Sequence, residues 1–156
     1  MTVRSTAGYP PGVRLEPLSV FRWSYDEDGR VKPYLIVSPY GSEEGIGYGE
    51  GRGTVSGRIE GTAVWSNYPR RRTDGRMLPN LRGVVTTHDG ASILFEFRGR
   101  TIFEGDEPGR QNLVGWFESD HESYRWLNDL VCIAEGQISS GEMVINVYAG
   151  LHEMQA

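Results

Sequence analysis

The stretch that decides the fold is VVTTHDGASILFEFRG, residues 84–99. Two runs rich in β-branched and aromatic residues, which favour strands, flank the dipeptide Asp89-Gly90. Asp-Gly is typical of tight hairpin turns, because these turns need a positive φ that glycine adopts without steric cost. We therefore predict two antiparallel strands joined by a turn at His88–Ala91.

Strand patterns of the same kind run through the rest of the chain. In LSVFRWSYD (18–26), Phe21, Trp23 and Tyr25 share one side, which predicts a half-buried strand. GIGYGEGRG (45–53) lacks the spacing of a dinucleotide-binding loop and is interpreted as a strand with one bare face. Eight or nine strands with one short helix near 121–129 favour a sandwich or a closed barrel. We expect one domain over 14–156, preceded by a flexible arm over 1–13.

The position of the hairpin turn decides which side chains face the interior. A turn at His88–Ala91 sets Thr87 opposite Ser92 and Arg82 opposite Phe97, and opposed residues share a face. Glu96 and Arg98 then point outward, where they pair with each other or with a neighbouring subunit. Arg82 points inward, where it extends to the barrel mouth, forms a structural ion pair or holds an acceptor. The expected inner face carries Arg82, Val84, Thr86, Ile93, Phe95 and Phe97.

Composition narrows the class of partner and compartment. The net charge of −5 argues against nucleic acid or an anionic membrane as the main partner. Cys132, the single cysteine, forms no intrachain disulfide and lies in an apolar run, so we expect a buried, inert thiol. No run approaches 18 apolar residues, and the first residues lack a signal-peptide pattern. We therefore expect a cytoplasmic protein with no membrane partner.

Several short motifs follow one another along the chain: Thr87-His88-Asp89-Gly90, Ile93, Phe95, Arg98-Gly99, Phe117-Glu118, Tyr124, Trp126-Leu127-Asn128 and Val147-Tyr148. In this order they resemble the domain-of-unknown-function family 3237 over roughly residues 15 to 150. The resemblance implies an antiparallel β-barrel, lipocalin-like or allene-oxide-cyclase-like, and usually a homo-oligomer. The family often has acidic residues where this chain has Val64 and Asn80, which puts proton transfer by such an acid in doubt here.

The residues favour acid–base chemistry in an apolar cavity over metal or nucleophilic chemistry. His88, His121 and His152 are scattered without metal-ligand spacing, and no G-x-S-x-G elbow or cofactor motif is present. We therefore expect no cofactor and no metal. A barrel of about eight strands can enclose one small ligand.

Particular residues are assigned roles in that cavity. Arg82 is expected to polarise a substrate oxygen, and His88 or Glu118 to move protons, with His121 as a further proton carrier. Asn128 either caps the short helix or reaches the interior. The run Arg70–Arg72 either clamps a carboxylate or phosphate at the mouth or forms a solvated loop tip. The expected aromatic lining consists of Trp23, Trp65, Tyr68, Trp116 and Tyr124.

These assignments lead to three functional hypotheses. The first is a cofactor-independent lyase, isomerase or cyclase that acts on a small, largely apolar or aromatic oxygenated metabolite. The second is a non-catalytic carrier or sensor that binds a similar ligand. The third is a structural protein that associates with itself through the face of Glu96 and Arg98. The sequence separates the first two poorly.

Overall fold

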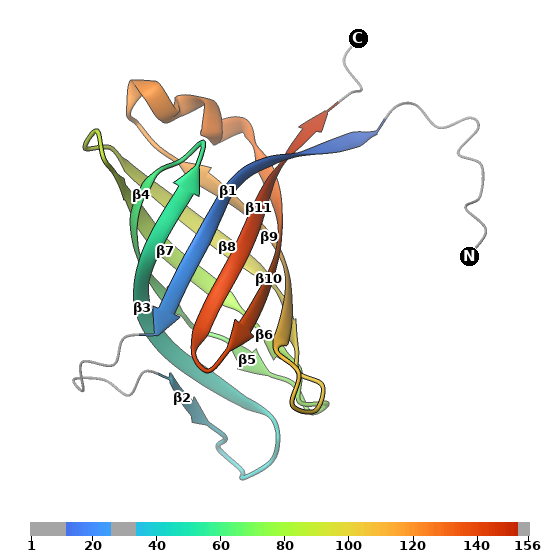
Figure 1. Ribbon diagram of the computed structural model, residues 1–156. Helices are drawn as coiled ribbons and strands as arrows, with labels where there is room; N and C mark the ends of the chain where they lie inside the picture. Colours follow the sequence, from blue (N-terminus) through green and yellow to red (C-terminus); the bar gives the residue numbers. More distant parts are fainter. Residues whose placement is uncertain (1–11, 26–33, 153–156) are drawn as a thin grey trace.

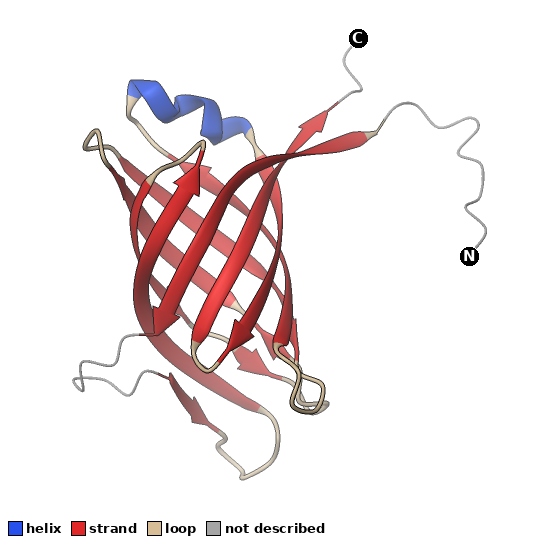
Figure 2. Ribbon diagram, in the orientation of Figure 1, coloured by secondary structure: helices blue, strands red, loops and turns tan. Residues whose placement is uncertain are grey.

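Eight long strands close on themselves into an antiparallel barrel in the computed structural model, which describes residues 12–25 and 34–152 (Figures 1 and 2). The expected barrel is confirmed. Most of the expected arm over 1–13 lies outside the described residues. Around the barrel the order is β1 (Val13–Tyr25), β11 (Glu142–His152), β10 (Val131–Ser139), β9 (Gly109–Glu118), β8 (Ser92–Ile102), β7 (Asn80–Thr87), β4 (Gly61–Asn67) and β3 (Gly45–Gly57), which returns to β1.

The two ends of the barrel differ. The 3-10 helix η1 (Glu122–Asp129) lies across one end and buries Leu127 there (Figure 1). At the other end, three short strands extend the wall: β2 (Tyr34–Val37), β5 (Arg70–Arg71) and β6 (Met77–Leu78). β2 and β5 pair with the first half of β3, and β6 joins β5 to β8. We call this second end the mouth.

The β7–β8 hairpin turns one residue more tightly than predicted. The Thr87 N–H donates to Ala91 O at 3.0 Å, and Gly90 has φ 85°, so the loop has three residues, with glycine in the left-handed region. Thr86 therefore lies opposite Ser92, and Arg82 lies opposite Glu96 rather than Phe97. A slip of one residue turns every side chain of a strand to the other face.

The prediction that Arg82 points into the barrel is therefore wrong. Leu81 and Val85 are the residues of β7 that are fully buried inside. The Arg82 side chain is 60% exposed on the outer face, and its Nη2 lies 3.4 Å from Glu96 Oε1. The outward placement of Glu96 and Arg98 is confirmed, and Arg98 Nη2 lies 2.8 Å from the same Glu96 oxygen.

Aromatic rings fill the middle of the barrel. Phe21 contacts the ring of Trp23 at a centroid distance of 4.8 Å, and Trp23 stacks on both Trp65 and Phe95 at 5.4 Å. These side chains are almost completely buried. Burial of large rings in close contact is the main favourable contribution to a core of this kind. Other core members are Phe97, Leu113, Phe117, Met143, Ile145 and Val147.

Glycines in β3 make room for this aromatic core, as the bare-face interpretation predicted. A Cβ added to Gly51 would lie 2.5 Å from Trp65 Cζ2 and 2.0 Å from the Ser24 carbonyl oxygen. A Cβ on Gly53 would lie 2.6 Å from Trp23 Cδ1. The two tryptophans therefore pack directly on the β3 backbone, where any side chain would displace them.

Two further expectations concern single features. Cys132 is buried, as predicted, and burial raises the pKa of its thiol to about 11. A thiol with a raised pKa holds little thiolate near neutral pH, so it is a poor nucleophile.

Within the described ranges, no helix has the length and apolar character needed to cross a membrane.

Candidate functional site

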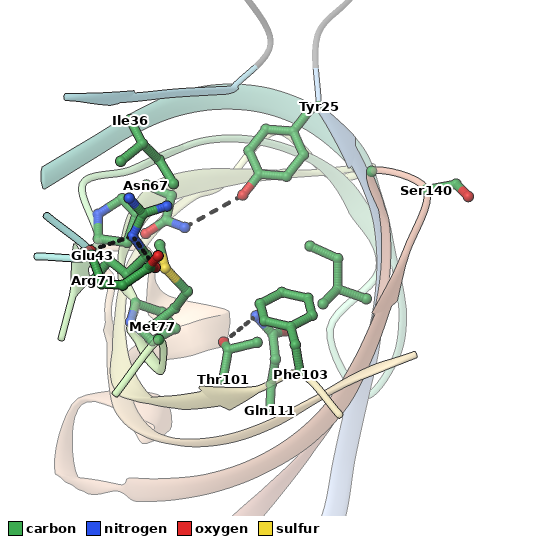
Figure 3. A pocket seen from close by; sticks show the side chains of 15 residues that line it. Tyr25, Ile36, Glu43, Asn67, Arg71, Met77, Thr101, Phe103, Gln111 and Ser140 are labelled. Atoms are coloured by element: carbon green, nitrogen blue, oxygen red, sulfur yellow. Dashed lines mark hydrogen bonds and ion pairs between the residues drawn. The ribbon is translucent and has the colours of Figure 1, made fainter. Parts of the chain in front are cut away.

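A cavity of about 490 Å³ opens at the mouth of the barrel, above the aromatic core (Figure 3). Its apolar wall includes Ile36, Met77, Phe103 and Ile138. Such a volume, mostly apolar with a few converging polar groups, is typical of small-molecule sites. The polar side chains that line it are Tyr25, Glu43, Asn67, Arg71, Thr101, Gln111 and Ser140.

The cavity exists because the inward positions change character towards the mouth. Along β8, Phe95 and Phe97 are followed at inward positions by Gly99 and Thr101. Along β9, read towards the mouth, Phe117, Gly115 and Leu113 give way to Gln111 and Gly109. Along β4, Trp65 is followed by Asn67. Smaller and polar side chains at the mouth ends of these three strands leave space that aromatic rings fill in the middle of the barrel.

Tyr25 and Asn67 form the polar pair above the core. The Asn67 Nδ2 donates to Tyr25 Oη at 3.4 Å, and Asn67 Oδ1 accepts from the Asn80 N–H at 3.0 Å. The Tyr25 ring also lies edge-on to Trp65 at a centroid distance of 4.9 Å. Burial raises the pKa of Tyr25, and the hydrogen bond from Asn67 only partly offsets this. The phenol is therefore neutral near pH 7 and can donate a hydrogen bond or a proton.

Arg71 supplies the positive charge at the rim. Its Nε donates to the Glu43 carbonyl oxygen, and its Nη2 donates to Ser38 Oγ at 3.0 Å. The same Nε lies 3.8 Å from the Glu43 carboxylate, and the Arg71 side chain is only 26% exposed. These contacts use two of the five guanidinium N–H groups, and the others can meet a ligand oxygen.

Of the three consecutive arginines, Arg71 lines the cavity, whereas Arg70 and Arg72 lie outside it. Arg70, next to Arg71 on β5, is 66% exposed and lies 3.4 Å from Glu44 outside the cavity. Arg72 pairs with Asp74 at 2.6 Å in the turn that follows. That bond, with the Arg76 N–H, lowers the pKa of Asp74 to about 2. The solvated-tip interpretation therefore fits Arg70 and Arg72, whereas Arg71 lines the mouth.

A buried amide completes the floor of the cavity. Gln111 and Thr101 are each 3% exposed, and Gln111 Nε2 donates to Thr101 Oγ1 at 3.1 Å (Figure 3). The other end of the amide, Gln111 Oε1, is buried and has no hydrogen-bond partner among residues 12–25 and 34–152.

The residues predicted to do chemistry lie elsewhere. Arg82 and Glu118 are outward on neighbouring parts of the wall, where they share a shallow outer groove with Trp116. His88 is exposed at the tip of the β7–β8 turn. His121 is the N-cap of η1, where its Nδ1 accepts the Ser123 N–H at 3.2 Å. None of these five side chains lines the mouth cavity.

The residues predicted to bind substrate are also distributed differently. Trp23 and Trp65 belong to the buried core and do not line the cavity, and Trp65 contacts the lining residue Tyr25. Tyr68 is 57% exposed on the outer wall, where its ring lies 6.1 Å from that of Tyr48. Tyr68 therefore does not line this cavity.

Tyr124 and Asn128 hold η1 on the far end of the barrel. Tyr124 Oη donates to Asp89 Oδ1 at 3.0 Å, which ties the helix to the β7–β8 turn. Asn128 Oδ1 accepts the Ser119 N–H at 2.8 Å, and its Nδ2 donates to Ser119 O at 2.9 Å. Asn128 thus neither caps the helix nor reaches the interior, because both ends of its amide bind the backbone at the end of β9.

Sequence reasoning missed Asn67, Gln111 and the role of Tyr25. The alternation in 18–26 placed Tyr25 on the side of Phe21 and Trp23, and that side is the interior. A single polar residue at an inward position of an otherwise apolar strand was the available signal for Asn67 and Gln111. Across the described ranges, no group of three or more His, Cys, Asp or Glu side chains is arranged to hold a metal ion.

Comparisons with known proteins agree on the fold. No curated protein matches the chain. A β-barrel-like protein from Acinetobacter baumannii is 17% identical with a TM-score of 0.79, and covers 92% of this chain and 99% of its own. A conserved protein of unknown function from Rhodopseudomonas palustris is 16% identical with a TM-score of 0.76, over 92% and 100%. A structure described as an enzyme from Penicillium herquei is 18% identical with a TM-score of 0.67, over 93% and 99%.

These likenesses, all below one-fifth identity, show the barrel and not an activity. The family is shown by a separate comparison, because the family described as "Protein of unknown function (DUF3237)" matches residues 15–149. That span contains all eight barrel strands except the ends of β1 and β11. The chain therefore belongs to the DUF3237 family, as the order of its motifs predicted.

Proposed function

We propose that the mouth cavity binds a small, largely apolar oxygenated metabolite and that the protein is a cofactor-independent isomerase, lyase or cyclase. The observation that carries this proposal is the convergence of a neutral phenol and a guanidinium on one apolar cavity of about 490 Å³. Apolar walls favour the hydrocarbon part of such a ligand, and the two donors favour its oxygen. The Penicillium herquei neighbour, described as an enzyme, is compatible with this class.

The proposed chemistry is polarisation of a carbonyl group. Arg71 and Tyr25 donate hydrogen bonds to the ligand oxygen, and both bonds strengthen as negative charge develops there. The proton removed from the adjacent carbon goes to the Glu43 carboxylate at the rim, and it returns to another carbon in an isomerisation. In this scheme Tyr25 takes the place that the sequence assigned to Arg82, and Glu43 takes the place assigned to His88 or Glu118.

A second candidate, a carrier or sensor, is favoured by one specific observation. Among the described residues that line the cavity, Glu43 is the only carboxylate and there is no histidine. The Glu43 side chain is 69% exposed, so water competes with a ligand for this carboxylate. A site that binds and polarises a ligand without a buried base would hold the ligand and leave it unchanged.

Two arginines of adjacent sequence provide the test. Arg71→Met removes the charge at the cavity, and Arg70→Met removes a charge from the same strand outside it. Binding of acetophenone, carvone and camphor is measured by calorimetry for wild type and both variants. We expect Arg71→Met to weaken binding by about tenfold or more, because charge-assisted hydrogen bonds are among the stronger ones. Arg70→Met should bind like wild type. Equal affinities for the two variants, or no binding to wild type, would overturn the proposal.

Exchange of carbon-bound hydrogen then separates the enzyme from the carrier. In D₂O, removal of a proton next to the carbonyl of carvone and return of a deuteron can be followed by NMR without knowledge of the natural substrate. Exchange faster than in buffer, and lost in Glu43→Gln, supports the enzyme. Binding that depends on Arg71 without added exchange supports the carrier.

A further inference from the structure

The amide of Gln111 presents an unpaired acceptor to the mouth cavity. Only 3% of Gln111 is exposed to solvent. The residue lines the cavity together with Phe103 and Ile138. Its Oε1 is shielded from solvent and finds no partner among the described residues. Buried polar atoms in native proteins are nearly always hydrogen-bonded, so an orphan oxygen at a cavity calls for a donor from outside the chain.

Thr101 fixes which end of this amide meets the ligand. Gln111 Nε2 donates to Thr101 Oγ1 at 3.1 Å, and Thr101 is itself buried opposite Gln111 on β8. With the nitrogen engaged in this way, the carbonyl oxygen is the end left for the cavity. Thr101 is therefore a positioning residue, because it acts through the amide.

We infer that the mouth cavity selects ligands that carry a hydroxyl group, which donates its hydrogen bond to Gln111 Oε1. This inference rests on the proposed function, and it adds a second recognition point to the oxygen held by Arg71. The substrate class is then a hydroxy-carbonyl compound with an apolar frame, such as a hydroxyaryl or hydroxyterpenoid ketone. A ligand ammonium group could also donate, but the guanidinium of Arg71 at the same cavity repels it.

Specificity of this kind has a clear physical basis. Gln111 Oε1 is already out of reach of water, so its desolvation cost is present in the unliganded protein. A ligand hydroxyl supplies the missing hydrogen bond, whereas a methyl group of the same volume leaves the oxygen unpaired. Sites built to bind a hydroxyl group therefore discriminate strongly against analogues that lack it.

Matched ketones test the inference on the wild-type protein. The dissociation constants of the three hydroxyacetophenones are compared with those of the three methylacetophenones, and the aminoacetophenones report on neutral N–H donors. We expect at least one hydroxy isomer to bind about tenfold or more tightly than its methyl counterpart. A ratio near one for all three pairs, or an amino isomer preferred to every hydroxy isomer, would overturn the inference.

Variants locate the discriminating group. Gln111→Met keeps an unbranched side chain of similar size without the amide, so the hydroxyl-to-methyl preference should fall to near one. Arg71→Met should weaken both series by a similar factor and leave the preference in place. A preference that persists in Gln111→Met would overturn the inference, and the wild-type comparison stands even if that variant fails to fold.

The outcomes also distinguish a failure of the hydroxyl inference from a failure of the proposed function on which it rests. If both series bind in an Arg71-dependent way but without preference, only the hydroxyl inference fails. If neither series binds, or if binding ignores Arg71, the proposed function fails and the inference fails with it.

Discussion

Asn67 holds the hydroxyl of Tyr25, although 42 positions separate the two residues, with Nδ2 of the amide 3.4 Å from the phenol oxygen. The other end of the same amide accepts the Asn80 N–H, so the orientation of Asn67 is set by the backbone of β7. Three barrel strands, β1, β4 and β7, thus meet through one side chain at the floor of the mouth. This relationship fixes the phenol that the proposed chemistry needs.

Replacement of Asn67 should lower stability. Asn67→Ala leaves the part-buried Asn80 N–H without its acceptor, and we expect the free energy of unfolding to fall by about 1–3 kcal/mol. Ser66→Ala, at the adjacent and outward position, should change it by less than about 0.5 kcal/mol. Chemical denaturation of both variants measures the difference. Equal losses in the two variants would contradict the role given to the Asn67 amide.

Removal of the Tyr25 hydroxyl should separate catalysis from binding. Tyr25→Phe keeps the ring against Trp65 and removes one neutral hydrogen bond, so the affinity for acetophenone should fall by about tenfold or less. The rate of carvone exchange should fall by about a hundredfold, because a positioned proton donor typically contributes that much. Parallel loss of affinity and rate would mean that the hydroxyl binds the ligand without assisting the reaction.

The raised pKa of Tyr25 also predicts a pH dependence. A raised pKa means that the folded protein favours the neutral phenol, so this contribution to stability is fully present below the unfolded pKa near 10. The contribution is lost as the pH rises through the higher pKa of the folded state. The pKa values of Tyr48, Tyr124 and Tyr148 are also raised, so several tyrosines should ionise late. A spectrophotometric titration of Tyr25→Phe should lack one of the late steps that wild type shows.

Asp74 predicts the opposite dependence at acid pH. Its pKa is lowered from 3.8 to about 2, chiefly by the hydrogen bond from Arg72. The contribution of Asp74 to stability is therefore present above the unfolded pKa and is lost as the pH falls through the folded one. Asp74→Asn should lower Tm near neutral pH and have a much smaller effect at about pH 2. The Tm difference between wild type and variant at the two pH values measures this.

The packing of Trp65 on β3 predicts the effect of a single methyl group. Gly51→Ala would set a Cβ 2.0 Å from the Ser24 carbonyl oxygen, which is backbone and cannot move away cheaply. We expect a loss of about 1–3 kcal/mol in the free energy of unfolding, as for other overpacked cores. Gly12→Ala is the control, because an added Cβ there meets no atom within 4 Å. A neutral Gly51→Ala would contradict the close approach of the Trp65 ring.

The outer face offers a contrasting substitution. Arg82→Ala removes an exposed ion pair with Glu96, and exposed pairs are worth about 0–1 kcal/mol. Binding of acetophenone should be unchanged, since Arg82 lies outside the cavity. An Arg82→Ala variant that lost binding would move the site to the outer groove shared with Glu118.

Association through this face, expected from Glu96 and Arg98, stays a prediction that ultracentrifugation can test.

The barrel itself was accessible from the sequence, because alternation and turn residues are local signals. The strand ending at Tyr25, the bare face of β3 and the β7–β8 hairpin all follow from such signals. The inward direction of β7 did not follow, because a turn of three residues and a turn of four are both compatible with Asp89-Gly90. That single residue decided whether Arg82 or Leu81 entered the core.

The site was less accessible because it forms from residues distant in sequence. Tyr25, Asn67 and Gln111 come from three strands, and barrel closure brings them to one end. Only Arg71 stood out beforehand, as part of a run of arginines. Its selection over Arg70 depends on the alternation of β5, a strand of two residues that is too short to recognise from a pattern.

An NMR titration of wild type with acetophenone tests the central claim most directly. If the mouth cavity is the site, the largest amide shift changes will lie at Asn67, Arg71 and Gln111. His88, Glu118 and Tyr124, at the far end and on the outer wall, should stay unchanged. Shift changes confined to the outer groove around Arg82 and Trp116, with none at the mouth, would contradict the account.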